Sequence, residues 1–285
     1  MEFLRPTTLA DALAAKAEYP SAVPIAGGTD VMVELNFDKR RPDALLDLGN
    51  VAELSTWDVE GAVLRLGASV PYARIITELS DRLPGLAMAA RTVGSPQIRN
   101  RGTVGGNLGS ASPAGDAHPS LLAVDAVVEV ASATGSRRVP ITEFFLGPKK
   151  SALAPDELVV AVRVPVATGP QQFAKVGTRN AMVIAVCSFG LAVHPGTTAV
   201  GTGIGSAGPT PLRAPEAEAF AAQELPWGTR GLLSDAVARR FGELVAAAAR
   251  PIDDVRGTAA YRRHALAVLA KRTLGWAWDE HRRSR

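Results

Sequence analysis

The sequence predicts an α+β protein of about two domains. Its 285 residues are more than one domain usually contains, and 47% of them are hydrophobic, which is enough for well-formed cores. In the C-terminal part, apolar strand patterns at 182–194 and 198–205 precede strong helical patterns at 234–250 and 258–276. Strands followed by helices within one domain are typical of the α+β class.

The chain up to about residue 55 indicates a small α/β subdomain. Thr8 begins a capping-box-like helix start, and Pro20 ends that helix. Apolar residues at 23–26 and 44–48 predict two strands.

The following part, up to residue 167, is predicted to be rich in β-structure. Residues 94–102 contain helix breakers, and 167–172 have the composition of a linker. The predicted elements are a hairpin at 56–67, helices at 71–83 and 86–93, an apolar run at 121–130, and strands at 137–141 and 158–164.

The stretch from Thr103 to Asp116 concentrates Gly, Ser, Thr and Asn as no ordinary core segment does. Gly105, Gly106 and Gly109 lack a Cβ, so we expect the backbone to turn through φ > 0 and approach a ligand closely. Successive amides there could hold phosphate.

A shorter stretch of the same kind comes earlier, where the apolar residues 23–26 lead into Gly27 and Gly28. Thr29 or Asp30 can then cap a helix whose first amides favour an anion. Two such loops suit a diphosphate, although either loop alone is more often an ordinary turn.

In this order and about 75 residues apart, the two loops resemble those of the FAD-binding medium subunits of the molybdenum hydroxylases, the family of xanthine and carbon monoxide dehydrogenases. The family carries an AGGTD-like loop, a TVGGN stretch that ends in A-S-P-x-x-D, and an F-x-K segment. This chain has Ala26 to Asp30, Thr103 to Asp116, and Phe173-Ala-Lys175. The resemblance covers essentially the whole chain.

The resemblance implies a PCMH-type FAD-binding domain over 1–167, with subdomains at about 1–55 and 56–167, and a CO dehydrogenase flavoprotein-like C-terminal domain over 173–285. It also implies the cofactor contacts. Val93 departs from the family, because fused animal enzymes place an aromatic residue there. The implied FAD-binding residues are Ala26, Gly27, Gly28, Thr29 and Asp30 in the first loop, Thr103, Val104, Gly105, Gly106 and Asn107 in the second, Asp116 as the loop-closing contact, Val93 and Val159 as apolar contacts, and Lys175 near the isoalloxazine.

As a function, the resemblance implies an electron-transfer subunit that carries noncovalent FAD. A large subunit would hold the molybdenum cofactor and a small one two [2Fe-2S] clusters, with a dimer of heterotrimers as the expected assembly. The electron acceptor would be NAD, oxygen or a quinone-linked carrier. The substrate would be xanthine or another purine, and it would be oxidised in the large subunit.

Three alternatives remain. The chain could be the medium subunit of a carbon monoxide or aldehyde dehydrogenase, an FAD-dependent oxidase of the vanillyl-alcohol-oxidase type, or a flavin-free binding module. The oxidase type needs a base or tyrosine near the flavin, and Tyr19, Tyr72 and Tyr261 all lie away from the loops in sequence. Electron transfer is therefore favoured.

Composition excludes several other functions. The balance of 31 basic against 28 acidic residues does not indicate nucleic-acid binding, and residues 281–285 are expected to be a solvated tail. Cys187 alone cannot support a disulfide framework or a cluster, and its apolar surroundings predict burial. We find neither a signal segment nor a membrane-span pattern, so a cytoplasmic protein is expected.

Two further patterns indicate structural or solvated residues rather than functional ones. The histidines His118, His194, His264 and His281 show no metal-ligand spacing, and His118 is expected to brace the principal loop. Arg99 and Arg101 could face phosphate, but solvated or structural arginines are more usual.

Residues 203–208 match G-x-G-x-x-G after a predicted strand, yet a dinucleotide fingerprint must open a helix. Pro209, Pro211 and Pro215, with Arg213, predict an extended, helix-poor continuation, so we reject a nicotinamide site there.

Overall fold

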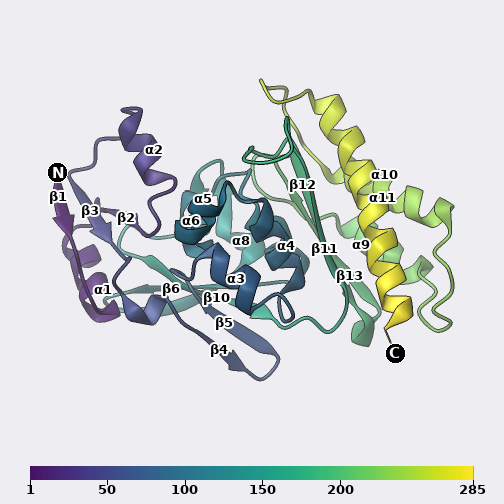
Figure 1. The fold of residues 1–285 in the computed structure, drawn as a ribbon, viewed down its shortest axis with the longest axis horizontal. Coiled ribbons are helices and arrows are strands. Elements are labelled where there is room, and N and C mark those ends of the chain that lie inside the picture. Colours follow the sequence, from purple (N-terminus) through teal and green to yellow (C-terminus); the bar gives the residue numbers. More distant parts are fainter. Residues whose placement is uncertain (285) are drawn as a thin grey trace.

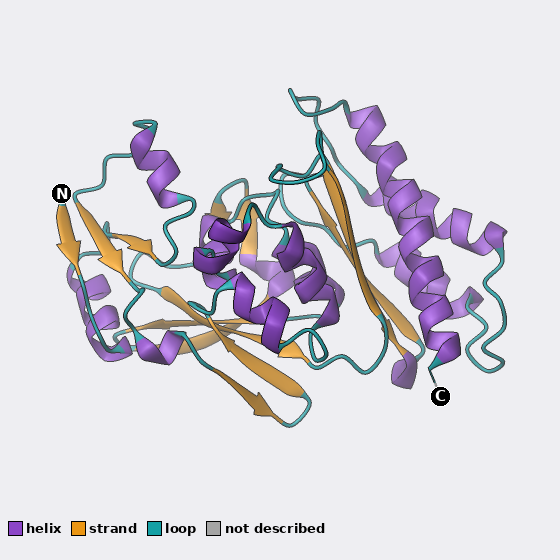
Figure 2. Cartoon of the chain, in the orientation of Figure 1, coloured by secondary structure: helices purple, strands orange, loops and turns teal. Residues whose placement is uncertain are grey.

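The computed structural model describes residues 1–284, and Arg285 lies outside the described residues. Three groups of strands follow one another along the long axis, with helices between and beyond them (Figure 1). The structure contains both helices and strands (Figure 2), and in the C-terminal part the strands come before the helices, which confirms the α+β class. Among residues 1–284, none of the helices combines the length and the apolar composition that a membrane span requires.

The N-terminal part is a three-stranded parallel sheet in the order β1-β3-β2. The side chain of Thr8 accepts a hydrogen bond from the Asp11 amide and caps the first helix, as predicted. The second helix stands apart from the body of the molecule (Figure 1), and none of its six residues is buried. The elements are β1 (Glu2–Leu4), α1 (Leu9–Glu18), β2 (Val23–Ile25), α2 (Val31–Asn36), β3 (Ala44–Asp47) and η1 (Ala52–Leu54).

The central part is a five-stranded antiparallel sheet in the order β4-β5-β10-β6-β7, with helices over it. Its largest apolar cluster includes Leu64, Leu66 and Phe144, each fully buried. The strands are β4 (Trp57–Glu60), β5 (Val63–Gly67), β6 (Val127–Ser132), β7 (Gly135–Pro140) and β10 (Leu158–Pro165), with a small hairpin of β8 (Phe145–Gly147) and β9 (Lys150–Ser151); the helices are α3 (Tyr72–Glu78), α4 (Pro84–Thr92), α5 (Pro96–Arg101), α6 (Val104–Ser110), α7 (Ala117–Ala123) and α8 (Ile141–Phe144).

The C-terminal part is a three-stranded antiparallel sheet, β11-β12-β13, with helices on both faces. The strands predicted at 182–194 and 198–205 do pair, although the first begins only at Cys187. The apolar core behind the sheet contains the fully buried side chains of Phe189, Phe241 and Trp278. The elements are β11 (Gln171–Val176), β12 (Cys187–His194), η2 (Pro195–Thr197), β13 (Ala199–Gly205), α9 (Pro215–Glu224), α10 (Asp235–Ala248) and α11 (Ala259–Arg283).

Two predictions about this part are wrong. The stretch after residue 208 is not helix-poor, because Pro215 occupies the first turn of α9, where a missing amide costs nothing. Residues 281–283 are not a solvated tail but the last turn of α11, and His281 is buried against Trp278.

Gly203, the first glycine of the apparent dinucleotide motif, has a structural role that it shares with Gly190 and Gly201. Helix α7 lies on the backbone of β12 and β13. A Cβ on Gly190 would lie 2.7 Å from the Pro119 carbonyl, and one on Gly203 would collide with the same carbonyl. Gly201 meets the Ala123 carbonyl in the same way. These glycines therefore let the helix and the sheet meet without side chains between them.

Candidate functional site

The structure places the first predicted loop against the residues directly before the second. A Cβ on Gly27 would collide with the carbonyl of Arg101, and one on Gly102 would lie 3.4 Å from Thr29 Oγ1. Gly28 has a φ of 75°, the left-handed region that favours glycine. The first loop is thus fitted against the residues that precede Thr103.

The first loop also has unused hydrogen-bond donors. Within residues 1–284, the amides of Gly27, Gly28, Thr29 and Asp30 donate to no protein acceptor. Four successive free donors beside a close-packed backbone form a site for an anion.

The second loop differs from the prediction, because its start is the helix α6. Thr103 caps this helix by accepting from the Gly106 amide at 3.0 Å. Gly105 donates to the Ala68 carbonyl and Asn107 to the Thr103 carbonyl, so these amides are not free for phosphate. Gly105, Gly106 and Gly109 do not have positive φ, so the expected φ > 0 turn is wrong: helical bonding governs this segment.

The adjacent glycines of α6 face different surroundings. A Cβ on Gly105 would lie 2.5 Å from both Cβ and O of Ala68, so this glycine is required for packing. Gly106 is exposed, and its Cβ would meet only Thr103 Oγ1, at 3.2 Å. The side chain of Val104 is buried in the core, so only its backbone could face a ligand. Gly106 is therefore open to the approach of a ligand, as is Gly109, which is also exposed and whose Cβ would meet no atom within 4 Å.

Lys175 and Asp116 form a buried ion pair at the junction of the central and C-terminal parts. Lys175 Nζ lies 2.6 Å from Asp116 Oδ2 and donates to the Thr92 carbonyl at 3.2 Å. Only 7% and 10% of the two side chains are exposed. Burial raises the pKa of the Asp116 carboxyl above its ordinary value, although the Lys175 ammonium opposes this.

His118 braces α6, as predicted. Its Nε2 donates to the Asn107 carbonyl at 3.2 Å, and its ring lies 4.5 Å from that of Phe145, centre to centre. Burial lowers the pKa of His118 to about 4, so the ring is neutral at physiological pH. A buried neutral imidazole with this partner supports the fold rather than proton transfer.

Tyr72 lies at the site, although its position in the sequence gave no sign of this. Its amide donates to the Gly102 carbonyl at 3.0 Å, and Pro71 forms a β-bridge with Thr103. The inference that the tyrosines all lie away from the loops is therefore wrong for Tyr72. Residue 72 reaches the loop beside the Pro71–Thr103 bridge, which forms only in the folded chain.

The two apolar contacts have different environments. Val93 caps the C-terminus of α4 and is partly buried against the central core. Val159 is 7% exposed within β10, opposite Val130 of β6. Arg99 donates to the carbonyls of Val93 and Gly94, which confirms the structural interpretation of that arginine.

A cavity of about 390 Å³ adjoins Val93 and the buried ion pair. Its walls are the segment between α4 and α5 and the loop after β11. The lining contains Arg91, Arg99 and Arg179 but no carboxylate, so the field inside is positive even though the fourth lining cation, Lys175, is paired with Asp116.

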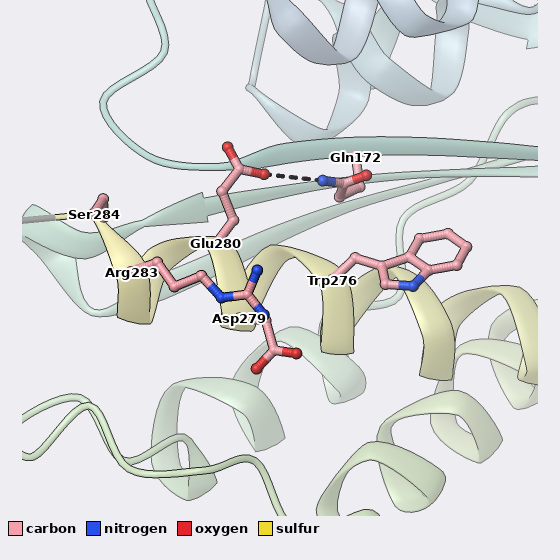
Figure 3. Close-up of a pocket in the computed structure, with 6 residues that line it drawn as sticks. All are labelled: Gln172, Trp276, Asp279, Glu280, Arg283 and Ser284. Atoms are coloured by element: carbon pink, nitrogen blue, oxygen red, sulfur yellow. Dashed lines mark hydrogen bonds between the residues drawn. The ribbon is translucent and has the colours of Figure 1, made fainter.

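A second cavity, of about 650 Å³, lies on α11 away from the predicted site residues (Figure 3). Gln172 Nε2 donates to Glu280 Oε2 at 3.1 Å across it, beside Trp276. Its lining shares no residue with either loop, so size alone does not mark the functional site.

Comparisons with known proteins agree across the chain. Residues 1–167 match the model described as "FAD binding domain in molybdopterin dehydrogenase", and residues 172–277 match "CO dehydrogenase flavoprotein C-terminal domain". The putative xanthine dehydrogenase FAD-binding subunit of Escherichia coli K12 is 33% identical over 286 residues, which cover 96% of this chain and 94% of the relative. The nicotinate dehydrogenase FAD-subunit of Eubacterium barkeri is 36% identical over 201 residues, 67% of this chain and 68% of the relative.

Solved structures give the same result. A chain of the Cu,Mo-CO dehydrogenase superposes with a TM-score of 0.90 at 26% identity, with 98% of both chains covered. A chain of the Hydrogenophaga pseudoflava carbon monoxide dehydrogenase that lacks the Mo-pyranopterin moiety gives 0.89 at 28% identity, covering 99% of this chain and 98% of that one.

Proposed function

Since this chain belongs to the FAD-binding medium subunits of the molybdenum hydroxylases, we propose that it carries electrons between a partner subunit and an external acceptor. Electrons would come from [2Fe-2S] clusters of a small partner and pass through FAD on this chain. The observation that carries the proposal is a loop with four free amides packed against residues 101 and 102, directly before the cap of α6 and its exposed Gly106.

The residues of the site fit FAD. Free amides at Gly27 to Asp30 suit the diphosphate, because that group offers only acceptors. Gly106 leaves room for close approach, and Asp116 has a buried oxygen, Oδ1, without a partner. When bound, FAD supplies the reversible one- and two-electron chemistry. The chain's residues hold it, orient it and exclude water.

Noncovalent binding is supported by the state of the nucleophiles. Cys187 is fully buried, and burial raises the pKa of its thiol to about 12, which disfavours the thiolate that a tether needs. Neutral His118 is also fully buried. Tyr72 lies near the loops, but burial raises the pKa of its phenol well above its ordinary value, so it is a poor base for an oxidase of the vanillyl-alcohol type.

The cationic cavity supports an anionic electron acceptor such as NAD. Arg91, Arg99 and Arg179 line it beside Lys175, and a positive cleft concentrates anions and speeds their association. A neutral quinone or oxygen would gain nothing from this field.

We assign the FAD-binding role to residues 1–167 and the C-terminal domain to 173–285. The proposed partners are a large molybdenum-cofactor subunit and the small iron–sulfur subunit, as a dimer of heterotrimers in the cytoplasm. The substrate would be oxidised in the large subunit. The Escherichia coli relative is named for xanthine dehydrogenase, which supports xanthine or another purine; the medium chain from Hydrogenophaga pseudoflava is named for carbon monoxide dehydrogenase, which keeps that alternative open.

The test uses the purified full chain. It should bind FAD that acid releases intact, and dithionite should bleach the flavin. With FAD bound, the lone chain should oxidise no purine, aldehyde or carbon monoxide, whereas the assembly co-purified from its source should oxidise at least one. A chain without flavin after FAD is supplied, or turnover by the metal-free chain, would contradict the proposal.

A further inference from the structure

Several residues around α6 carry buried polar atoms without a protein partner. Besides Ser69 Oγ and His118 Nδ1, these atoms include the hydroxyl of Tyr72 and the Oδ1 atoms of Asn107 and Asp116. Buried polar groups are normally hydrogen-bonded, so a concentration of unpaired atoms marks a place where another molecule completes the bonding. Tyr72, Asn107 and Asp116 come from three different elements, which are α3, α6 and the start of α7.

The position of Tyr72 relative to the loops is fixed by backbone contacts. Besides the bond from its amide to the Gly102 carbonyl, its Cδ2 would lie 3.5 Å from a Cβ on Gly102. Its ring is 2% exposed, so it cannot turn out to solvent. After burial, the carboxylates of Asp116 and Asp30 contribute most to raising the pKa of the phenol. The hydroxyl therefore lies in the field of the first loop and of Asp116 together.

This environment defines the chemistry of the hydroxyl. Because burial, with the Asp116 and Asp30 carboxylates, raises the pKa of the phenol, it stays protonated and is a hydrogen-bond donor. The unpaired oxygens of Asn107 and Asp116 are acceptors. One buried donor and two buried acceptors suit a polyol, whose hydroxyls both donate and accept, flanked by an anion.

We propose that Tyr72 is a further FAD-binding residue, whose hydroxyl donates to the ribityl–diphosphate segment while Asn107 and Asp116 accept from the same segment. The inference rests on the proposed binding of FAD. It adds a residue from α3 to a site otherwise built from the two loops, Asp116 and Lys175.

The first test is Tyr72→Phe, which keeps the ring and removes the oxygen. FAD should bind roughly three- to tenfold more weakly, as for one lost hydrogen bond, while the melting temperature of the FAD-free variant stays equal or rises. Tyr261→Phe is the matched control, since that side chain is 49% exposed on α11, and should change neither quantity. Unchanged FAD affinity in Tyr72→Phe, or equal destabilisation with and without FAD, would overturn the assignment by indicating a bond within the protein.

A second measurement does not depend on a variant that folds. The chain has three tyrosines, so uniform 3-fluorotyrosine labelling gives three fluorine resonances. Addition of FAD should shift the resonance of Tyr72 and leave those of Tyr19 and Tyr261 in place. If wild-type protein binds no FAD, the proposed function fails; if it binds FAD and the Tyr72 resonance does not move, only the assignment of Tyr72 fails.

Discussion

Lys175 Nζ and Asp116 Oδ2 are 2.6 Å apart, and this ion pair joins β11 to the first residue before α7. The family resemblance implied that Lys175 lies near the isoalloxazine. The structure gives that cation a carboxylate partner in a buried setting, so its charge is largely balanced before any flavin binds. What a flavin would meet here is a dipole rather than a single charge.

Lys175→Met and Asp116→Asn should shift the flavin midpoint potential in opposite directions. Loss of the ammonium leaves negative charge near the ring, which disfavours the anionic reduced flavin and lowers the potential; loss of the carboxylate raises it. We expect shifts of tens of millivolts, since about 30 mV corresponds to about 1.4 kcal/mol for a two-electron couple. The double variant should return close to the wild-type value.

Redox titration of the FAD-loaded wild-type protein, the two single variants and the double variant measures these midpoint potentials. If Lys175→Met binds FAD fully and keeps the wild-type potential, the ion pair does not face the ring.

Gly105 and Gly106 should respond differently to the same substitution. Gly106→Val should abolish FAD binding in a protein that still folds, because its Cβ meets only Thr103 Oγ1 and valine is no worse than glycine in a helix. Gly105→Val should prevent stable folding through its clash with Ala68. Thermal unfolding and FAD titration separate the two effects.

Gly135→Val is the control for these variants, because a Cβ at Gly135 meets no atom within 4 Å. Full FAD affinity in Gly106→Val would mean that the cofactor does not approach this face of α6.

His118 should make the protein sensitive to acid. Burial lowers the pKa of its imidazole from 6.5 to about 4, so the unfolded chain takes up a proton at a higher pH than the native state does. The contribution of neutral His118 to the free energy of unfolding is fully present above about pH 6.5. It is lost as the pH falls toward 4, a decrease of about 3 kcal/mol in all. His118→Gln should flatten this part of the curve of unfolding free energy against pH.

Urea unfolding across that pH range is the measurement, with the exposed His264→Gln as a control that keeps the wild-type slope. An unchanged slope in His118→Gln would mean that other groups cause the acid sensitivity.

Gly203→Ala should destabilise the junction between α7 and the C-terminal sheet. The new Cβ would collide with the Pro119 carbonyl, and backbone atoms on both sides leave little room to relax. We expect a loss of roughly 1–3 kcal/mol, as for other overpacked sites. Gly196→Ala, in the exposed turn between β12 and β13, should have no such cost. Equal melting temperatures for the two variants would refute the close-contact role of Gly203.

Much of the fold follows from local signals. The Thr8 cap, the hairpin at 56–67, the pairing of β12 with β13, and helices α10 and α11 were predictable, because each depends on periodicity, capping or turn residues within one segment.

The missed helices share a cause. Pro96 and Pro215 indicate helix breaks when the sequence is considered alone, yet both lie in the first turn of a helix, where proline is favourable. The apolar run at 121–130 also concealed a boundary: α7 ends at Ala123, Asp125 turns through a φ of 52°, and β6 follows.

The candidate site was only partly predictable. The positions of both loops could be predicted, because their glycine patterns and the order of these patterns are visible in the sequence. Which glycine packs and which faces a ligand depends on Ala68 and Arg101, and these residues reach the loops only in the folded chain. The same is true of Tyr72, which no pattern connects to residue 102.

The glycine-lined contact between α7 and the C-terminal sheet bears on how such a chain can be divided. One family model ends at residue 167 and the other begins at residue 172, so the two halves could be regarded as exchangeable modules. Yet a cut there would strip α7 of the backbone surface on which it lies and would remove Lys175 from Asp116. A chimera that joins the first half of this chain to the second half of a relative must therefore match Gly190, Gly201 and Gly203 to the course of α7, and not only the linker sequence.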